Sequence, residues 1–183
     1  LMIRRPPRST LSSSSAASDV YKRQGGTAVE AMVAAAAQIA VVYPHMNSIG
    51  GDGFWLIKKK DRSPVAISAC GPAAEQAIPE WYKRKGYKSF LPTRGPLAAL
   101  TVPGTIAGWK LALTLDNPKR AVPLNDLLSA AVERAKNGVA VTKNQHETLA
   151  AKKHELVSVS GFKDFYLDKG HEPEVGSNFF NRN

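Results

Sequence analysis

The sequence predicts a chain of the α/β (α+β) class that is mostly helical and carries one β-hairpin. Three segments predict this: an alanine-rich helix over residues 28–43, two short apolar strands within residues 54–68, and an amphipathic helix over residues 123–137. The 183 residues, 43% of them hydrophobic and 22% charged, suit one globular domain or a piece of a larger protein. Because Cys70 is the only cysteine, the chain cannot form an intrachain disulfide.

The first helix is predicted from its start signal and its composition. Thr27 and Glu30 have the spacing of a capping box, in which the hydroxyl and the carboxylate satisfy two backbone amides at a helix start. Ala, Val, Met and Ile fill almost every position from Ala28 to Tyr43, and Pro44 ends the run. Since the run is apolar on all sides and its side chains are small, we expect a buried helix that lies closely on a sheet. It is too short to span a membrane, which takes roughly 20 apolar residues.

A glycine-rich turn, Gly50 to Gly53, leads into the predicted hairpin. The first strand, Phe54 to Ile57, is continuously apolar, so we expect it to be buried on both faces. Three lysines mark a solvent-exposed turn, and the second strand returns over residues 65–68. The glycine turn is not a phosphate-binding loop, because no lysine followed by serine or threonine comes after it and a strand, not a helix, follows.

Further helices are predicted from the residues that mark their starts and ends. Pro79 and Gly86 bound a short helix, and Pro123 and Gly138 bound the amphipathic helix. A second capping box at Thr142 opens a helix that ends near residue 156, and beyond residue 158 the pattern weakens. Residues 95–104 are interpreted as a strand or extended loop, and residues 105–115 as a helix. The apolar stripe of the amphipathic helix consists of Leu124, Leu127, Leu128, Val132 and Ala135.

The formal net charge of +10 raises the question of a nucleic-acid partner. Residues 1–24 supply +4 of this charge, and the remaining cations are spread over several turns, so we expect no nucleic-acid partner. We interpret residues 1–24 as a disordered, non-native tail that resembles a translated assembly artefact, since they hold too little apolar surface to fold. The organised part covers residues 25–175, and residues 176–183 look like a truncated end.

No catalytic set is visible in the residues themselves. The four histidines lack the spacing of a helical zinc site, so we predict no metal, and no serine lies in a nucleophile elbow. Cys70 follows an apolar strand without a nearby histidine, and we interpret it as a buried or pocket-lining thiol. No cofactor is implied. The histidines are His45, His146, His154 and His171.

Taken in order, several of these segments resemble the γ-glutamyltranspeptidase family, in the N-terminal part of its large subunit. The matching segments are Gly25–Ala31, Val42–His45, Ile49–Phe54, Leu97–Trp109 and Pro123–Val141. The resemblance implies an incomplete αββα sandwich of the N-terminal-nucleophile (Ntn) hydrolases, made as a precursor that cuts itself into two subunits. It also implies that the nucleophile is the N-terminal threonine of the small subunit, downstream of residue 183. The threonines considered and assigned structural roles are Thr27, Thr93, Thr101, Thr105 and Thr142.

The family implies one substrate-binding residue in this region, an arginine that binds the α-carboxylate of the glutamyl group just after the second hairpin strand. Here Cys70 or Pro72 stands opposite that arginine, and neither can bind a carboxylate. Arg62 and Arg94 are the nearest spare arginines, and neither matches the family position. These are the candidate substrate-binding positions that the sequence offers.

Three functions therefore stay open. The first is transfer of a γ-glutamyl group from glutathione or a γ-glutamyl amide to water or an amino acid, with the chain inactive alone because it lacks the nucleophile. The second is a divergent Ntn amide hydrolase or acylase with another substrate. The third is a basic nucleic-acid-binding module, which the spread of the cations over several turns disfavours. The expected partners are a small-molecule substrate and the small catalytic subunit. The compartment stays open, although family resemblance implies the periplasm or the outside of the cell.

Overall fold

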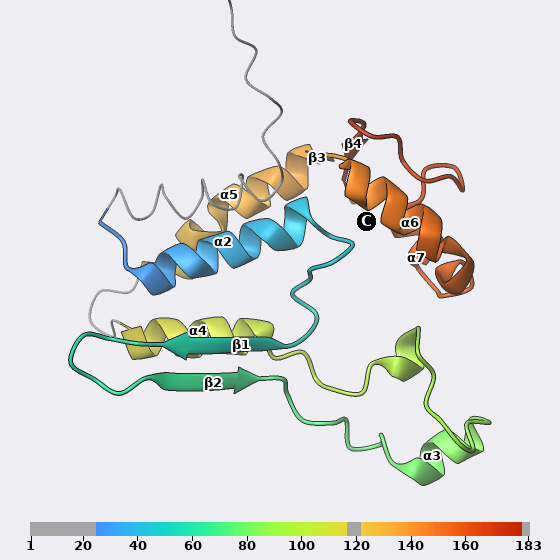
Figure 1. Cartoon of the computed structure of the whole chain (residues 1–183), viewed down its shortest axis with the longest axis horizontal. Coiled ribbons are helices and arrows are strands. Elements are labelled where there is room, and N and C mark those ends of the chain that lie inside the picture. The colour runs from blue at the N-terminus through green and yellow to red at the C-terminus, as the bar shows by residue number, and fades with distance from the viewer. Residues whose placement is uncertain (1–24, 117–121, 181–183) are drawn as a thin grey trace, which may run out of the picture.

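The computed structural model describes residues 25–116 and 122–180, so the predicted tail and the last three residues of the predicted truncated end lie outside it. Figure 1 shows the arrangement of the elements. The helices are α2 (Ala28–Val42), α3 (Pro79–Arg84), α4 (Thr105–Asp116), α5 (Leu124–Asn137), α6 (Lys143–Leu156) and α7 (Phe162–Tyr166), with a 3₁₀ turn at Pro96–Ala98. The strands are β1 (Gly53–Ile57), β2 (Val65–Ala69), β3 (Val139–Ala140) and β4 (Asn178–Phe179).

The predicted hairpin is confirmed, but its predicted burial is wrong. β1 and β2 pair antiparallel, with Gly53 opposite Ala69 at one end and Ile57 opposite Val65 at the other. Phe54 is 72% exposed and Leu56 is 77% exposed, whereas Ile57 and Ile67 are buried. Alternate side chains of a strand point to opposite faces, so only one face of this hairpin is packed. The other, which we call the open face of the hairpin, is apolar and uncovered in the described part of the chain.

The alanine-rich helix α2 is confirmed, but it does not lie directly on the hairpin as predicted. It packs chiefly against α5, whereas α4 is the helix that contacts both strands, and Figure 1 shows α2 beside α5 with α4 next to the hairpin. Val33 of α2 and Leu127 of α5 are buried in the shared core, together with Trp109 of α4. The small side chains of α2 thus allow a second helix, not a sheet, to approach closely.

The predicted helix signals around this core are confirmed. Thr27 and Glu30 form both hydrogen bonds of the capping box, and the same Glu30 carboxylate accepts a bond from the backbone amide of Val122. The start of α2 is therefore tied to the segment that enters α5. α5 begins after Pro123 and ends at Gly138, whose φ of 82° is a conformation that favours glycine.

The second capping box is only half formed. The Thr142 hydroxyl accepts from the backbone amide of Gln145, but the Gln145 side chain returns no bond; it is fully buried, and its amide oxygen and nitrogen both lack partners. Beyond residue 158, where the sequence pattern weakens, α7 forms and β4 pairs antiparallel with β3. Contacts such as that between the rings of Phe165 and Phe179, 5.7 Å apart, stabilise these short elements.

Residues 95–104 contain the 3₁₀ turn and an isolated bridge between Thr101 and Ala73, so the predicted extended loop is confirmed and no continuous strand forms. No helix in the described residues is long and apolar enough to cross a membrane.

Candidate substrate-binding site

The segment that follows β2 is fixed by backbone bonds to the strand-like residues before α4. The amide of Val102 donates to the carbonyl oxygen of Pro72 at 2.9 Å, and the amide of Ala74 donates to that of Leu100 at 3.0 Å. Together with the bridge between Ala73 and Thr101, these bonds form a short antiparallel pairing. The position at which the family arginine is expected therefore lies on a well-defined piece of backbone. We call residues 70–73 the post-β2 segment.

Two glycines allow this close approach. Gly71 has a φ of 71°, and a Cβ added there would lie 2.9 Å from the carbonyl carbon of Val102. A Cβ on Gly104 would lie 2.8 Å from the carbonyl carbon of Ala69. Real Cβ atoms do not come so close to backbone atoms, so any side chain here would force the two backbones apart. The glycines thus hold the post-β2 segment against the start of α4.

The glycine-rich turn before β1 caps the start of α4. The carbonyl oxygen of Gly51 accepts bonds from the amides of Gly104 and Thr105, both at 3.1 Å, and from the Thr105 hydroxyl at 2.7 Å. Amides at a helix start need such acceptors when they are buried. The turn, the start of α4 and the post-β2 segment are therefore one connected unit.

Cys70 and Pro72, the two candidate positions, lie at the edge of this unit. Cys70 is half-buried with a free thiol whose sulfur lies 3.2 Å from the Ser68 hydroxyl oxygen, and Pro72 is exposed. Ser68 stands directly opposite Phe54 in the hairpin, so both point to the same face. The thiol of Cys70 therefore lies beside the open face of the hairpin.

Neither spare arginine approaches these positions. Arg94 is bound to Glu155 on α6, with both its Nε and a terminal nitrogen 3.1 Å from the carboxylate. Arg62 lies in the turn between β1 and β2, at the opposite end of β2 from Cys70. The structure thus brings no sequence-proposed arginine to the post-β2 segment.

The histidine side chains of His45 and His146 form hydrogen bonds away from the post-β2 segment. His45 Nε2 lies 2.8 Å from the side-chain oxygen of Asn144, which also accepts a bond from the Tyr43 hydroxyl. His146 bonds to the carbonyl oxygen of Pro173, and His154 is exposed, as expected for the solvated end of a helix. Across the residues that the structure describes, no group of three or more His, Cys, Asp or Glu side chains could hold a metal ion.

The threonines that lie in the described elements carry structural bonds. Thr27 and Thr142 cap helices, Thr105 bonds to the glycine turn, and the Thr101 hydroxyl lies 3.4 Å from an Asp52 carboxylate oxygen. The four hydroxyls thus form hydrogen bonds within the fold, and their assignment as structural residues stays a prediction.

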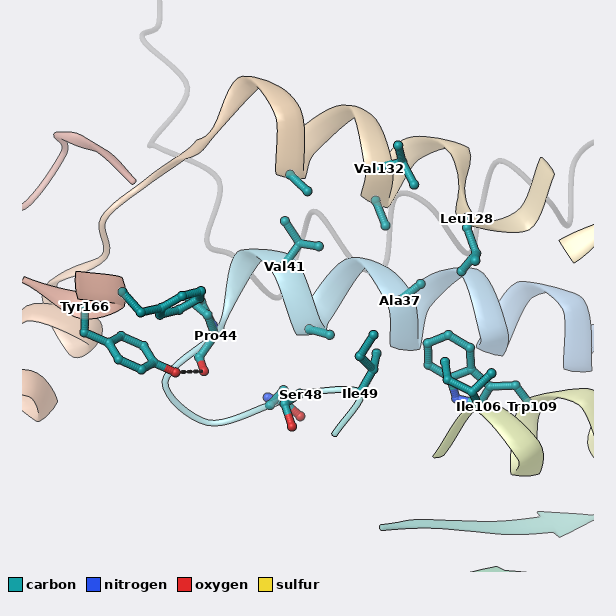
Figure 2. Close-up of a pocket in the computed structure, with 15 residues that line it drawn as sticks. Ala37, Val41, Pro44, Ser48, Ile49, Ile106, Trp109, Leu128, Val132 and Tyr166 are labelled. Atoms are coloured by element: carbon teal, nitrogen blue, oxygen red, sulfur yellow. Dashed lines mark hydrogen bonds between the residues drawn. The ribbon is translucent and has the colours of Figure 1, made fainter. Parts of the chain in front are cut away.

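Sequence reasoning missed an apolar cavity of about 330 Å³ between α2, α5, α4 and α7. Figure 2 shows Val41, Ile106 and Leu128 directed toward it. Tyr166 is its titratable group; its hydroxyl donates to the carbonyl oxygen of Pro44 at 3.0 Å, and burial raises its pKa. Most of its lining is apolar, so this cavity supplies mainly packing surface. Only the meeting of four helices creates it, so no local signal could have revealed it.

Comparison with known proteins shows the family of this chain. The gamma-glutamyltranspeptidase family model matches residues 13–183. The oxamate amidohydrolase proenzyme of Klebsiella pneumoniae is 48% identical over 159 residues, covering 86% of this chain and 30% of the relative. The glutathione hydrolase-like YwrD proenzyme of Bacillus subtilis is 33% identical over 157 residues, covering 85% of this chain and 29% of the relative. The chain thus spans about 30% of the length of these curated relatives.

Solved structures agree with this assignment. The γ-glutamyltranspeptidase of Helicobacter pylori has a TM-score of 0.78 and 27% identity, covering 99% of this chain and 50% of that one. The cephalosporin acylase of Bacillus halodurans has a TM-score of 0.79 and 28% identity, covering 91% of this chain and 31% of that one. The predicted fold class, part of an Ntn hydrolase, is confirmed. This chain belongs to the γ-glutamyltranspeptidase family, within the N-terminal part of the large subunit.

Proposed function

We propose that the protein containing this chain hydrolyses a small amide whose acyl group is not γ-glutamyl. The observation that carries the proposal is the sequence Cys70-Gly71-Pro72 after β2, where the family resemblance implies a carboxylate-binding arginine. The chemistry would be that of the family: an N-terminal threonine, outside these 183 residues, attacks the amide carbonyl while its own amine acts as base. The C–N bond of the amide breaks, the nitrogen takes up the proton and leaves as ammonia or an amine, and water then releases the acyl group from the threonine.

The physical argument is a missing charge. An arginine binds a carboxylate through two parallel charge-assisted hydrogen bonds, and losing such a pair removes on the order of 2 kcal/mol of binding. Neither a thiol nor a proline ring can replace it. The two backbones approach closely at Gly71 and Gly104, so a larger residue at either position would require the backbone to move. Recognition of a glutamyl α-carboxylate by the post-β2 segment is therefore disfavoured.

The name of one relative also favours a substrate other than a γ-glutamyl amide. The Klebsiella pneumoniae protein at 48% identity is named for oxamate, whereas the relatives named glutathione hydrolases have 28–33% identity. Oxamate is the monoamide of oxalic acid, and it is much smaller than a γ-glutamyl group. We therefore take oxamate as the first substrate to test.

The second candidate is hydrolysis or transfer of a γ-glutamyl group, with glutathione as donor. The names of the glutathione hydrolases among the relatives favour it, because they match the same part of this chain. Under this function a cation from outside the described residues would bind the glutamyl carboxylate.

Under either function, the small catalytic subunit is the proposed partner. The open face of the hairpin suits it, since Phe54 and Leu56 expose apolar surface beside Cys70. In this arrangement the chain supplies substrate-binding backbone and a docking face, and the partner supplies the nucleophile. We expect the 183-residue chain alone to release no glutamate from a γ-glutamyl anilide, and measurable turnover would contradict this division of roles.

The decisive experiment uses the full-length processed protein and compares kcat/KM for ammonia release from oxamate with kcat/KM for glutamate release from glutathione. We expect oxamate to be favoured by about tenfold or more, which is 1.4 kcal/mol of transition-state binding. A preference for glutathione would contradict the proposal and favour the second candidate.

A variant tests the role of the post-β2 segment. Cys70→Arg should strengthen binding of glutamate, measured by calorimetry, because it restores a cation at the family position. Cys70→Ser is the matched control, since it changes the thiol without adding charge. Equal glutamate binding by the two variants would exclude this position from carboxylate recognition.

A further inference from the structure

A second cavity lies beside the post-β2 segment, between α3 and the loop that follows it. Its volume is about 400 Å³, which is within the range of small-molecule sites. Figure 1 shows α3 away from the α2, α4 and α5 helices, so this cavity is separate from the apolar one described above. The residues that give it its chemical character are Tyr82, Lys83, Tyr87, Lys88, Phe90 and Leu100.

The aromatic wall of this cavity is held in place before any ligand binds. Tyr82 is only 5% exposed, and its hydroxyl donates to the carbonyl oxygen of Leu97 at 3.0 Å. The amide of Tyr87 donates to the carbonyl oxygen of Tyr82, and the two rings meet edge to face with centroids 6.5 Å apart. Such a wall offers apolar contact without the entropy cost of ordering loose side chains.

The charge around the cavity is positive. Lys83 and Lys88 each follow a tyrosine of the wall, line the cavity and are exposed, whereas no lining residue is acidic. Lysines at such a rim can lay their aliphatic stems on apolar surface while the ammonium groups stay in water. The cavity therefore combines a largely apolar wall with two exposed lysines among its lining residues.

We propose that this cavity binds a carboxylate carried on an apolar or aromatic body. The aromatic wall would bury the body, and the two lysines would form charge-assisted hydrogen bonds with the carboxylate. Phe90 at the rim is 79% exposed, so it is available to cover the ligand.

This cavity adjoins the candidate substrate-binding site. Ala73 lines the cavity and belongs to the post-β2 segment, where it pairs with Thr101. A ligand bound in this cavity would therefore lie close to the post-β2 segment. The inference does not depend on which amide the protein cleaves, because direct binding tests it.

The experiment is an NMR titration of the full chain with 3-phenylpropionate, which has both the charge and the aromatic body. Two matched probes each lack one part: 3-phenylpropanol lacks the charge, and acetate lacks the body. We expect saturable shifts of the amides of residues 82–91 with 3-phenylpropionate, about fivefold weaker binding of 3-phenylpropanol, and no saturation with acetate. The variant Lys83→Gln/Lys88→Gln should bind the acid and the alcohol equally.

Lys85→Gln is the matched control, because Lys85 lies on the same chain segment but over the Trp81 ring, 5.6 Å from its centroid, and does not line the cavity. It should keep the preference for the acid. Equal binding of the acid and the alcohol by the unmodified chain would overturn the proposal. So would an equal loss of preference in Lys85→Gln, or shifts that fall outside the cavity.

Discussion

Two regions of the chain are stabilised in different ways. The central unit, made of α2, α4, α5 and the hairpin, shares one apolar core in which Val33, Ala112 and Leu127 are almost wholly buried. The C-terminal unit, made of α6, α7, β3 and β4, contributes no residue to that core among the described positions. It has apolar contacts of its own, such as that between the rings of Phe165 and Phe179, and surface ion pairs such as that of Lys153 with Glu172 at 3.2 Å. We therefore expect the central unit to respond chiefly to side-chain volume in its core, and the C-terminal unit to respond also to protonation of its paired carboxylates.

The largest expected effect is at Gly104. Gly104→Ala would place a methyl group against the carbonyl group of Ala69, so we expect a loss of more than about 3 kcal/mol of unfolding free energy, measured by urea denaturation. Gly51→Ala is the control, because a Cβ there meets no atom within 4 Å, and it should change stability by no more than about 0.5 kcal/mol. Similar losses of unfolding free energy in both variants would show that the close approach of the backbones at Gly104 does not cause the destabilisation.

The next effect tests the core of the central unit. Leu127 is 1% exposed, so Leu127→Ala should lower the unfolding free energy by about 2–3 kcal/mol through lost transfer energy and the cavity left behind. Leu111→Ala on α4 removes the same atoms from a side chain that is 46% exposed, and its effect should be less than half as large. If the two variants were equally destabilised, α5 would not belong to the shared core.

A third change should stabilise the C-terminal unit. Gln145 is fully buried with both side-chain amide atoms unpaired, so Gln145→Met should raise the unfolding free energy by about 1 kcal/mol. The cap of α6 would survive, because Thr142 accepts from the backbone of residue 145. Thr142→Ala is the contrasting variant and should cost about 1 kcal/mol. A destabilised Gln145→Met would mean that the amide has partners in solution.

The smallest effect is a pH dependence. Hydrogen bonds from Lys152 and Arg94 lower the pKa of Glu155, and a backbone hydrogen bond and Lys153 lower that of Glu172, in both cases below the ordinary value of 4.5. Because the folded-state pKa is depressed, this stabilisation is present above pH 4.5 and is lost as the pH falls through the folded-state values. Both carboxylates are near the surface, so the effect should be small.

The measurement is the urea midpoint as a function of pH. The variant Glu155→Gln/Glu172→Gln should show a shallower fall below pH 4.5 than the unmodified chain. Identical profiles would mean that these ion pairs do not stabilise the fold.

Local signals predicted most of the elements correctly. Thr27 with Glu30, and Pro123 with Gly138, located helix boundaries because capping depends on residues that are neighbours in the chain. The burial of β1 and the neighbour of α2 were predicted wrongly, since an apolar run does not reveal which other element covers it. The candidate positions Cys70 and Pro72 came from family resemblance, and their substrate-binding role stays a prediction.

The sequence by itself determined where α2, α5 and the hairpin begin and end, and it identified the family through the order of its segments. Only the tertiary structure decided that α4 lies on the hairpin, that Gly71 and Gly104 join the post-β2 segment to α4, and that Arg94 pairs with α6. The physical reason is how far apart in the sequence the interacting residues lie. Helix caps and turns are set within a few residues, whereas the approach of two backbones and the partner of a charge depend on residues far apart in the chain.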